Sequence, residues 1–369
     1  HDVSIQQYVL ESLGFNVISS NVVHIDTSYV RGDELDLNGL FTIANVSDEV
    51  NALQAGIPQK LSEFEMYLSD REHEPNIEIG KHCNNPYKCD AKDYCWKVQR
   101  DIPDYSVFNI FNPGTKKQIE LYEQGIVKIE EIPDELKMTA IQKQKVENWK
   151  SQASYIDKES IEAFLDTLTY PIYHLDFETF QQAIPEWKGI SPYQQIPFQY
   201  SLHIEHADGT LEHKEFLAED GSDPRQELAT RLVEDIPVHV TVLAYNMSFE
   251  KGVIEKLAIN YSELTDHLRS INENLNDLML PFQKQYYVTP QMQGSYSIKY
   301  VLPALVPEME RAYKELDGVQ NGTEAMNAFA RLSRMAPEEK EKIRNALLAY
   351  CKLDTLAMVE ILKHLKGVL

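Results

Sequence analysis

The stretch Tyr170-Pro-Ile-Tyr-His-Leu-Asp-Phe-Glu-Thr-Phe180 decides the fold, because it predicts a buried strand that carries two acids. Successive side chains of a strand point to opposite faces, so Asp176 and Glu178 share one face while Leu175 and Phe177 share the other. Two like charges this close are unfavourable in a partly buried place unless a cation lies between them or one is protonated. The pattern therefore predicts a divalent-metal site. The alternative is an edge strand with two solvated acids.

The composition is that of a globular protein, with 369 residues of which 43% are hydrophobic. This length allows two or three domains. The formal net charge of −23 argues against broad electrostatic binding to nucleic acid or to an anionic membrane, so any nucleic-acid contact must be local, in a groove where metal ions supply positive charge. The sequence has no secretory pattern and no run of about 18 apolar residues, so we expect a cytoplasmic protein without a membrane partner.

The first hundred residues predict a mixture of helices and strands without an active site of their own. The pattern predicts a helix over 2–13, a hairpin of strands 15–23 and 24–30, and a long helix over 46–68 that is broken near Gly56-Ile-Pro58. The chain opens with His1 inside a helical pattern, so we expect it to be a fragment of a longer protein.

Three of the four cysteines, Cys83, Cys89 and Cys95, follow one another at steps of six residues in a loop. Thiolates at this spacing can turn toward one centre, and they select Zn²⁺ or an iron–sulfur cluster. Both kinds of site usually need four ligands, and Cys351 lies far along the chain. A fourth ligand before His1 would complete the site. The alternative is three free thiols in a reducing cytosol.

This cysteine motif, Gly80-x-His-Cys-x5-Cys-x5-Cys-Trp96, resembles the C-terminal iron–sulfur segment of RecB-type nucleases of the PD-(D/E)XK class. The opening Asp2-Val-Ser-Ile-Gln-Gln-Tyr-Val-Leu10 is similar to the glutamine-bearing helix that follows their catalytic strand. Their catalytic Glu-x-Lys strand and upstream cysteine have no counterpart here. The resemblance implies that residues 1–100 are the C-terminal remnant of such a domain, with an incomplete [4Fe-4S] or zinc site and no chemistry of its own.

Residues 101–167 are predicted to form a helical connector, with short helices over 116–124, 133–151 and 158–168. Solvated bundle helices explain their charged faces, and a helix-hairpin-helix contact with DNA is the alternative.

Residues 168–369 predict an α/β domain in which acids come from several elements. Asp176 and Glu178 lie on the first strand, Glu250 follows a strand-to-helix junction, and Asp354 lies on the final helix, one turn after Tyr350. A two-metal phosphodiesterase needs several acids from different elements, because two divalent ions activate water and stabilise the leaving oxygen.

The order of these residues resembles the three motifs of the DEDD exonuclease superfamily, in its tyrosine subtype. The motifs are Asp176-x-Glu178, then Asn246-x-x-Phe-Glu250, then Tyr350-x-x-x-Asp354. The resemblance implies a ribonuclease-H-like mixed sheet flanked by helices, and 3′–5′ hydrolysis of DNA or RNA that has a free 3′ end. It also implies that Asp176, Glu178, Glu250 and Asp354 hold two Mg²⁺ or Mn²⁺ ions while Tyr350 places the attacking water.

One motif departs from this family, because its second acid is normally Asp and here it is Glu250. Asp277 is a second candidate for this ligand, and the alternative for Asp277 is a surface acid at a helix end. Lys299 is a candidate for contact with phosphates.

The complete layout also resembles a bacterial family described only as a domain of unknown function. The phrases that carry the likeness include Asp176-Phe-Glu-Thr-Phe180 and Ala244-Tyr-Asn-Met-Ser-Phe-Glu250. A nuclease-derived binding or scaffold protein without turnover is the alternative function.

Overall fold

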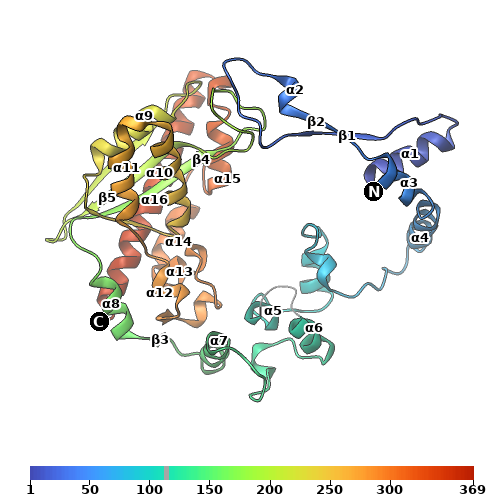
Figure 1. Cartoon of the computed structure of the whole chain (residues 1–369). Coiled ribbons are helices and arrows are strands. Elements are labelled where there is room, and N and C mark those ends of the chain that lie inside the picture. Colours follow the sequence, from blue (N-terminus) through green and yellow to red (C-terminus); the bar gives the residue numbers. More distant parts are fainter. Residues whose placement is uncertain (112–115) are drawn as a thin grey trace. The chain divides into compact units, whose positions relative to one another are not determined.

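The structure is a computed structural model that describes residues 1–111 and 116–369. These residues form two compact units, whose elements are labelled in Figure 1. The first unit comprises residues 1–79 and 181–194, and the second comprises residues 80–180 and 195–369. The described part of the predicted connector therefore lies in the same unit as most of the predicted C-terminal domain, and the predicted boundaries at residues 100 and 167 both fall inside that unit.

The first unit consists of short helices and a two-stranded sheet. Its elements are α1 (Asp2–Ser12), β1 (Asn21–Ile25), α2 (Leu37–Leu40), β2 (Phe41–Asn45), α3 (Ser47–Gln54) and α4 (Ile57–Ser69). The predicted break near Gly56 is confirmed, since it separates α3 from α4. The predicted hairpin of residues 15–23 with 24–30 is wrong, because β1 pairs antiparallel with β2. Asp26 ends β1: its carboxylate accepts the backbone N–H of Ser28 at 2.8 Å and the Ser28 hydroxyl at 2.6 Å, which turns the chain.

Residues 181–194 join the first unit through hydrogen bonds to the segment that follows β1. The backbone N–H of Arg31 donates to the carbonyl of Ile190 at 3.0 Å, and the N–H of Gly189 donates to the carbonyl of Arg31 at 2.8 Å. The Arg31 guanidinium also donates to the carbonyl of Pro185 at 2.6 Å. These residues lie between two strands of the second unit in the sequence, so the chain passes between the units three times.

The second unit begins with a series of short helices. They are the turns Lys81–Cys83 and Tyr94–Val98, α5 (Val107–Ile110), α6 (Lys116–Glu123), the turn Ile129–Glu131, α7 (Ala140–Ser151) and α8 (Lys158–Leu165). The helix predicted from Pro133 begins only at Ala140, because Thr139 caps it. The Thr139 hydroxyl accepts the N–H of Gln142 at 3.3 Å, and the Gln142 side chain accepts the N–H of Thr139 at 3.0 Å.

A five-stranded mixed sheet forms the centre of the second unit (Figure 1). Its strands are β4 (Ile172–Phe180), β5 (Ile196–Glu205), β6 (Leu211–Leu217), β7 (Thr241–Ala244) and β8 (Leu275–Asp277), and their order is β6-β5-β4-β7-β8. β4 is antiparallel to β5 and parallel to β7, and β7 is parallel to β8. β5 pairs antiparallel with β6. This mixed sheet flanked by helices confirms the predicted α/β class.

Helices cover both faces of this sheet. They are α9 (Arg225–Asp235), α10 (Ser248–Asn260), α11 (Thr265–Glu273), α12 (Leu280–Gln283), α13 (Ile298–Leu305), α14 (Pro307–Lys314), α15 (Gly322–Phe329) and α16 (Pro337–Gly367). The Tyr200 hydroxyl donates to Asp235 of α9 at 2.6 Å, whereas the neighbouring Gln199 donates to the Leu347 carbonyl of α16 at 2.8 Å. Successive residues of β5 therefore face α9 and α16 on opposite sides. Within the described residues, no helix has both the length and the apolar character needed to span a bilayer.

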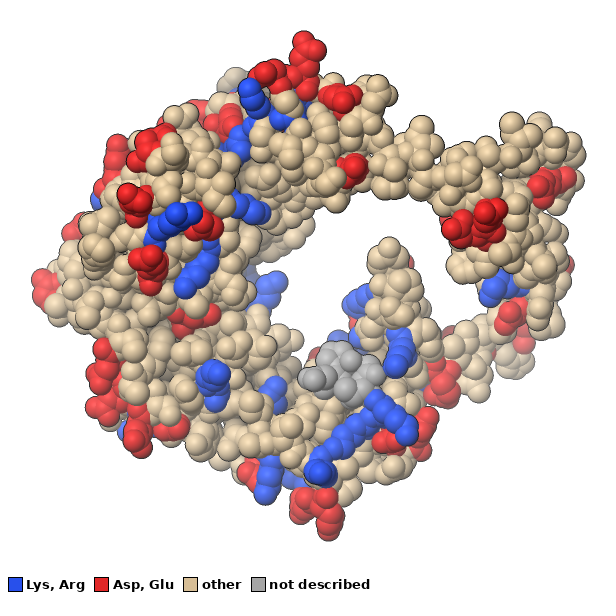
Figure 2. Space-filling view, viewed as in Figure 1, with Lys and Arg blue, Asp and Glu red and all other residues tan. Residues whose placement is uncertain are grey.

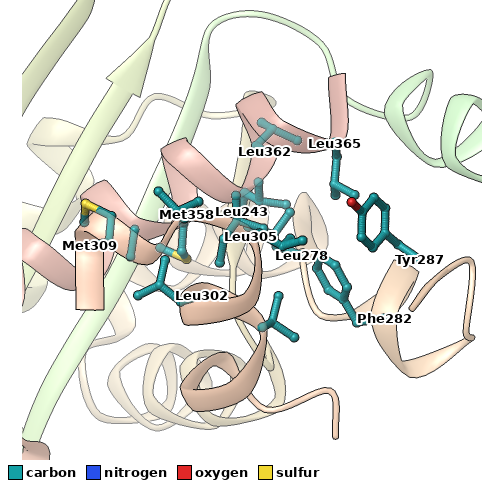
Figure 3. Packing of buried hydrophobic residues seen from close by; sticks show 14 of the residues in the cluster. Leu243, Leu278, Phe282, Tyr287, Leu302, Leu305, Met309, Met358, Leu362 and Leu365 are labelled. Atoms are coloured by element: carbon teal, nitrogen blue, oxygen red, sulfur yellow. The ribbon is translucent and has the colours of Figure 1, made fainter. Parts of the chain in front are cut away.

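An apolar cluster packs α13 and α16 against β4 and β7 of the sheet. In Figure 3, Leu243 of β7 and Leu278 lie among Leu302 and Leu305 of α13 and Met358 of α16. Each such side chain contributes about 1.5–3 kcal/mol when it is fully buried. This packing fixes the position of the helix that carries Tyr350 and Asp354.

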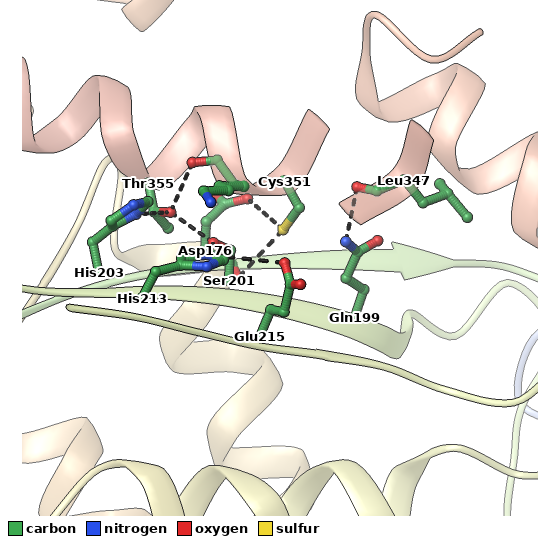
Figure 4. A network of polar contacts seen from close by, with 10 residues as sticks. Asp176, Gln199, Ser201, His203, His213, Glu215, Leu347, Cys351 and Thr355 are labelled. Atoms are coloured by element: carbon green, nitrogen blue, oxygen red, sulfur yellow. Dashed lines mark hydrogen bonds and ion pairs between the residues drawn. The ribbon is translucent and has the colours of Figure 1, made fainter. Parts of the chain in front are cut away.

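A buried polar network holds α16 against β5 near the acids (Figure 4). The Thr355 hydroxyl contacts the Ser201 hydroxyl at 2.7 Å and Nδ1 of His203 at 2.7 Å. Ser201 also contacts Nε2 of His213 at 3.0 Å. Ser201 and Thr355 are completely buried, so their hydroxyl groups have no contact with water. The network sets the position of α16 along the sheet.

We expect Thr355→Val to lower the free energy of unfolding by about 2 kcal/mol or more, because it leaves buried polar atoms of Ser201 and His203 without this partner. Thr355→Ser is the matched control, since it keeps the hydroxyl and removes one methyl group, at about 1 kcal/mol. Urea unfolding at pH 7.5 measures both values. A valine variant as stable as the serine variant would show that the network does not hold the helix.

Candidate metal centre

Three carboxylates from two elements converge in the second unit. Asp176 and Glu178 alternate along β4 and face α16, because they pair with Ser201 and Gln199 of β5, whose side chains contact that helix. Asp354 lies on α16. One oxygen atom from each of Asp176, Glu178 and Asp354 lies within 4.8 Å of the other two. The structure thus brings together three of the four acids that the sequence predicts as metal ligands.

All three acids have raised pKa values. Burial raises the pKa of Asp176 well above its usual value, and the charges of Asp354, Glu178 and Glu250 raise it further. Burial and the charge of Asp354 raise the pKa of Glu178 to about 8. Burial also raises the pKa of Asp354 to about 7, although hydrogen bonds from Tyr313 and Tyr350 oppose the shift.

These three residues fit a divalent cation. Hard oxygen ligands suit Mg²⁺ and Mn²⁺, and like charges in a buried place are stable only with protons or a cation between them. The charges that raise the pKa values of Asp176 and Glu178 are those of neighbouring acids. Asp176, Glu178 and Asp354 would therefore hold the ion.

Glu250 lies outside this group of three. It lies in the first turn of α10, and its side chain is almost fully buried. One of its carboxylate oxygens, Oε2, has no hydrogen-bond partner among the described residues. Burial raises the pKa of Glu250 to about 8, and the charge of Asp277 adds to the rise. Because Glu250 influences the pKa of Asp176 without entering the cluster, the structure leaves the fourth predicted ligand apart from the other three.

Asp277 stabilises the backbone near Glu250. Its Oδ1 atom accepts the backbone N–H of Asn246 at 2.9 Å and that of Met279 at 2.9 Å. Asn246 has a left-handed backbone, with φ of +67°, at the turn that leads from β7 into α10. Asp277 therefore fixes the turn that precedes Glu250. It ends β8 rather than lying at the end of a helix.

Two tyrosines contact the Asp354 carboxylate. Tyr350, one helical turn earlier, forms a hydrogen bond with it. The Tyr313 hydroxyl donates to Oδ1 of Asp354 at 2.6 Å. The two rings meet edge to face, with centroids 6.2 Å apart. Tyr313 is missed by sequence reasoning because it lies on α14, 41 residues before Asp354, in a segment without a motif.

Cys351 contacts the cluster from the same helix. Its Sγ atom lies 3.8 Å from Oδ2 of Asp176 and is completely buried. From the sequence, Cys351 is only one residue of a predicted helix. No spacing rule predicts its contact with Asp176. The contact fills the space between α16 and β4 behind the carboxylate.

A pocket of about 330 Å³ opens beside the acids. Its lining comes from α13, α14, α16 and the start of α15, and it includes Lys299, Tyr313, Tyr350 and Asp354. Gly322 borders Glu178 so closely that a β-carbon there would lie 3.7 Å from the Glu178 Oε2 atom. The pocket thus combines an exposed cation, two phenols and an acid of the cluster.

The three loop cysteines have different surroundings. Cys83 is buried, Cys89 is exposed and Cys95 is half-buried. Among the described residues, the acids are the only group of three or more possible ligands that lie close enough to share an ion. Within residues 1–111 and 116–369, Cys83, Cys89 and Cys95 therefore do not form such a group, and the zinc or iron–sulfur site stays a prediction.

His174 lies on the same face of β4 as Asp176 and Glu178, but it is part of the buried core. It is completely buried, and its Nε2 atom lies 3.2 Å from Oε2 of Glu205. Glu205 also accepts the Lys366 ammonium at 2.6 Å. These contacts join β4, β5 and the end of α16.

Comparisons with known proteins match part of the chain to a family model without an assigned role. A family model described as a domain of unknown function (DUF2779) matches residues 173–297, a range that contains Asp176, Glu178 and Glu250 but not Asp354. The chain is similar to the uncharacterized protein UU173 of Ureaplasma parvum serovar 3 (strain ATCC 700970), with 25% identity over 236 residues. The match covers 58% of this chain and 34% of that protein, so the chain spans about a third of the relative's length. No solved structure matches the chain.

Proposed function

We propose that the second unit hydrolyses phosphodiester bonds of DNA or RNA from a 3′ end, with Mg²⁺ or Mn²⁺ held by the acid cluster. The observation that carries the proposal is the convergence of Asp176, Glu178 and Asp354, whose ligand oxygens lie within 4.8 Å of one another in a partly buried place. The strand order, with β5 antiparallel between β4 and β6, agrees with the ribonuclease-H-like sheet implied by the sequence motifs.

The bound ions would activate water and stabilise the leaving oxygen. The chain's own residues supply the other requirements. Tyr350 lies at the pocket wall beside Asp354, where its hydroxyl can orient a water molecule. Lys299 at the rim offers an ammonium to a phosphate of the chain.

Nucleic acid would reach this site through local contacts. Figure 2 shows acidic side chains interleaved with basic ones over the visible face of α9, α10 and α11. With a net charge of −23, the chain has little long-range attraction for a polyanion. We therefore expect binding that depends on the divalent ion and on a single strand entering the pocket.

The second candidate function is nucleic-acid binding without turnover. It is favoured by the position of Glu250 outside the group of three acids, which leaves a second ion short of a ligand. Both functions require the ion and the pocket, but only the first releases nucleotides.

The deciding experiment follows the release of mononucleotides from 3′-labelled single-stranded DNA and RNA in Mn²⁺. We expect release that stops with EDTA and falls at least about 10³-fold in Asp176→Ala, because the variant loses a metal ligand. A substrate blocked by a 3′-phosphate is the control for direction. If Asp176→Ala keeps full activity, a contaminating nuclease is responsible. Tight Mn²⁺-dependent binding without release would favour the second function.

A further inference from the structure

We infer that Tyr313 is a positioning residue of the metal centre, which orients the Asp354 carboxylate for the ion. This inference rests on the proposed function, because it assigns a role within the same site. Tyr313 belongs to none of the three sequence motifs. Its hydroxyl lies 2.6 Å from Oδ1 of Asp354, which is a short and therefore strong hydrogen bond to a carboxylate.

The packing of α14 holds the Tyr313 ring in place. α14 begins at Pro307 and is anchored by Met309, which is 8% exposed and belongs to the apolar cluster that also holds α13 and α16. Figure 3 shows Met309 at the end of this cluster near Met358. The Tyr313 ring packs against the same cluster and meets the Tyr350 ring edge to face. Rigid placement of this kind is what a positioning residue needs, since a ligand must be held to within about 0.5 Å.

The contact selects one orientation of the carboxylate. Asp354 has two oxygens, and its cluster with Asp176 and Glu178 requires that one of them faces β4. A hydrogen bond from Tyr313 to Oδ1 fixes the rotation of the carboxylate, because a free carboxylate turns readily about its last side-chain bond. Partners that orient metal ligands in this way typically affect metal affinity by 10–100-fold.

Tyr313 also connects the metal centre with the pocket. It lines the pocket together with Tyr350, so the same side chain contacts Asp354 through its hydroxyl and borders the pocket with its ring. Removal of the hydroxyl alone separates these two contacts, because phenylalanine keeps the ring.

The test is Mn²⁺ affinity of the complete chain, measured from the electron paramagnetic resonance signal of free Mn²⁺. We expect Tyr313→Phe to bind Mn²⁺ about tenfold more weakly than the natural chain. The Mn²⁺ concentration for half-maximal nucleotide release should rise equally. Tyr287→Phe is the matched control. It removes a hydroxyl that contacts Nε2 of His364 at 2.9 Å, and neither residue belongs to the group of acids. It should bind Mn²⁺ normally.

Each outcome decides the matter. If Tyr313→Phe melts within a few degrees of the natural chain and binds Mn²⁺ equally well, the inference is overturned, and the proposed function can still hold. If the natural chain binds Mn²⁺ and the variant binds it weakly, but neither releases nucleotides, the inference stands and the proposed function fails. If Tyr287→Phe loses as much affinity as Tyr313→Phe, the effect is one of general packing and the inference fails. A natural chain that binds no Mn²⁺ overturns both.

Discussion

Glu178→Gln is expected to abolish Mn²⁺-dependent nucleotide release and to stabilise the metal-free protein. The pKa of the Glu178 carboxyl is raised to about 8 by burial and by the charge of Asp354. In the unfolded chain this group ionises near its ordinary value of 4.5. The contribution of the protonated Glu178 carboxyl to the free energy of unfolding is therefore complete below pH 4.5 and is lost as the pH rises toward 8. Glutamine keeps the shape of the side chain and removes this loss.

The gain at pH 8 should be on the order of 2 kcal/mol in the free energy of unfolding, less than the full pKa shift suggests, because the cluster can relax. Urea unfolding in EDTA measures it. Glu162→Gln on the exposed side of α8 is the control and should stay within about 0.5 kcal/mol of the natural chain. A glutamine variant that is less stable than the natural chain would show that the acids do not repel one another.

Mn²⁺ is expected to raise the melting temperature by an amount that grows between pH 6 and pH 8. The ion must displace protons from Glu178, whose pKa is about 8, and from Asp354, whose pKa is about 7. This displacement becomes easier as the pH approaches these values, while the metal-free cluster loses stability over the same range. At 100 times the dissociation constant, binding contributes about 2.7 kcal/mol.

Thermal melting with and without Mn²⁺ at each pH gives this difference directly. The comparison is needed because burial lowers the pKa of His203 to about 3 and that of His213 to about 4. Their contribution to stability is lost as the pH falls below the unfolded value of 6.5, and it cancels between the metal-free and loaded forms. Glu178→Gln should lose most of the Mn²⁺ shift. An equal Mn²⁺ shift at pH 6 and pH 8 would contradict a cluster that binds protons and the ion in competition.

Part of the site could be predicted because local rules fix it. The alternation of a strand puts Asp176 and Glu178 on one face, and helical spacing puts Tyr350 and Asp354 together. Local rules do not predict that Asp354 lies beside Asp176 and Glu178. The order of the motifs suggested this proximity, and the packing of α16 on β4 produces it.

The remainder depends on tertiary packing without a local signal. Tyr313 reaches Asp354 only because the apolar cluster seats α14 beside α16. Likewise, nothing near residues 15–30 indicates that β1 pairs with residues 41–45, since antiparallel partners are chosen by side-chain packing across strands. The location of Glu250 depends on the length of one side chain and on a turn fixed by Asp277.

The path of the chain between β4 and β5 has a consequence for dissecting the protein. Residues 181–194 leave the sheet directly after the strand of Asp176 and Glu178, pack with residues 1–79, and return at β5. A truncated chain that starts at residue 80 would lack Arg31, the hydrogen-bond partner of residues 181–194. Such a chain needs a short linker in place of residues 181–194, joining Phe180 to Gln195. Without the linker, Asp176 and Glu178 would be followed by a loop that has lost its packing partners.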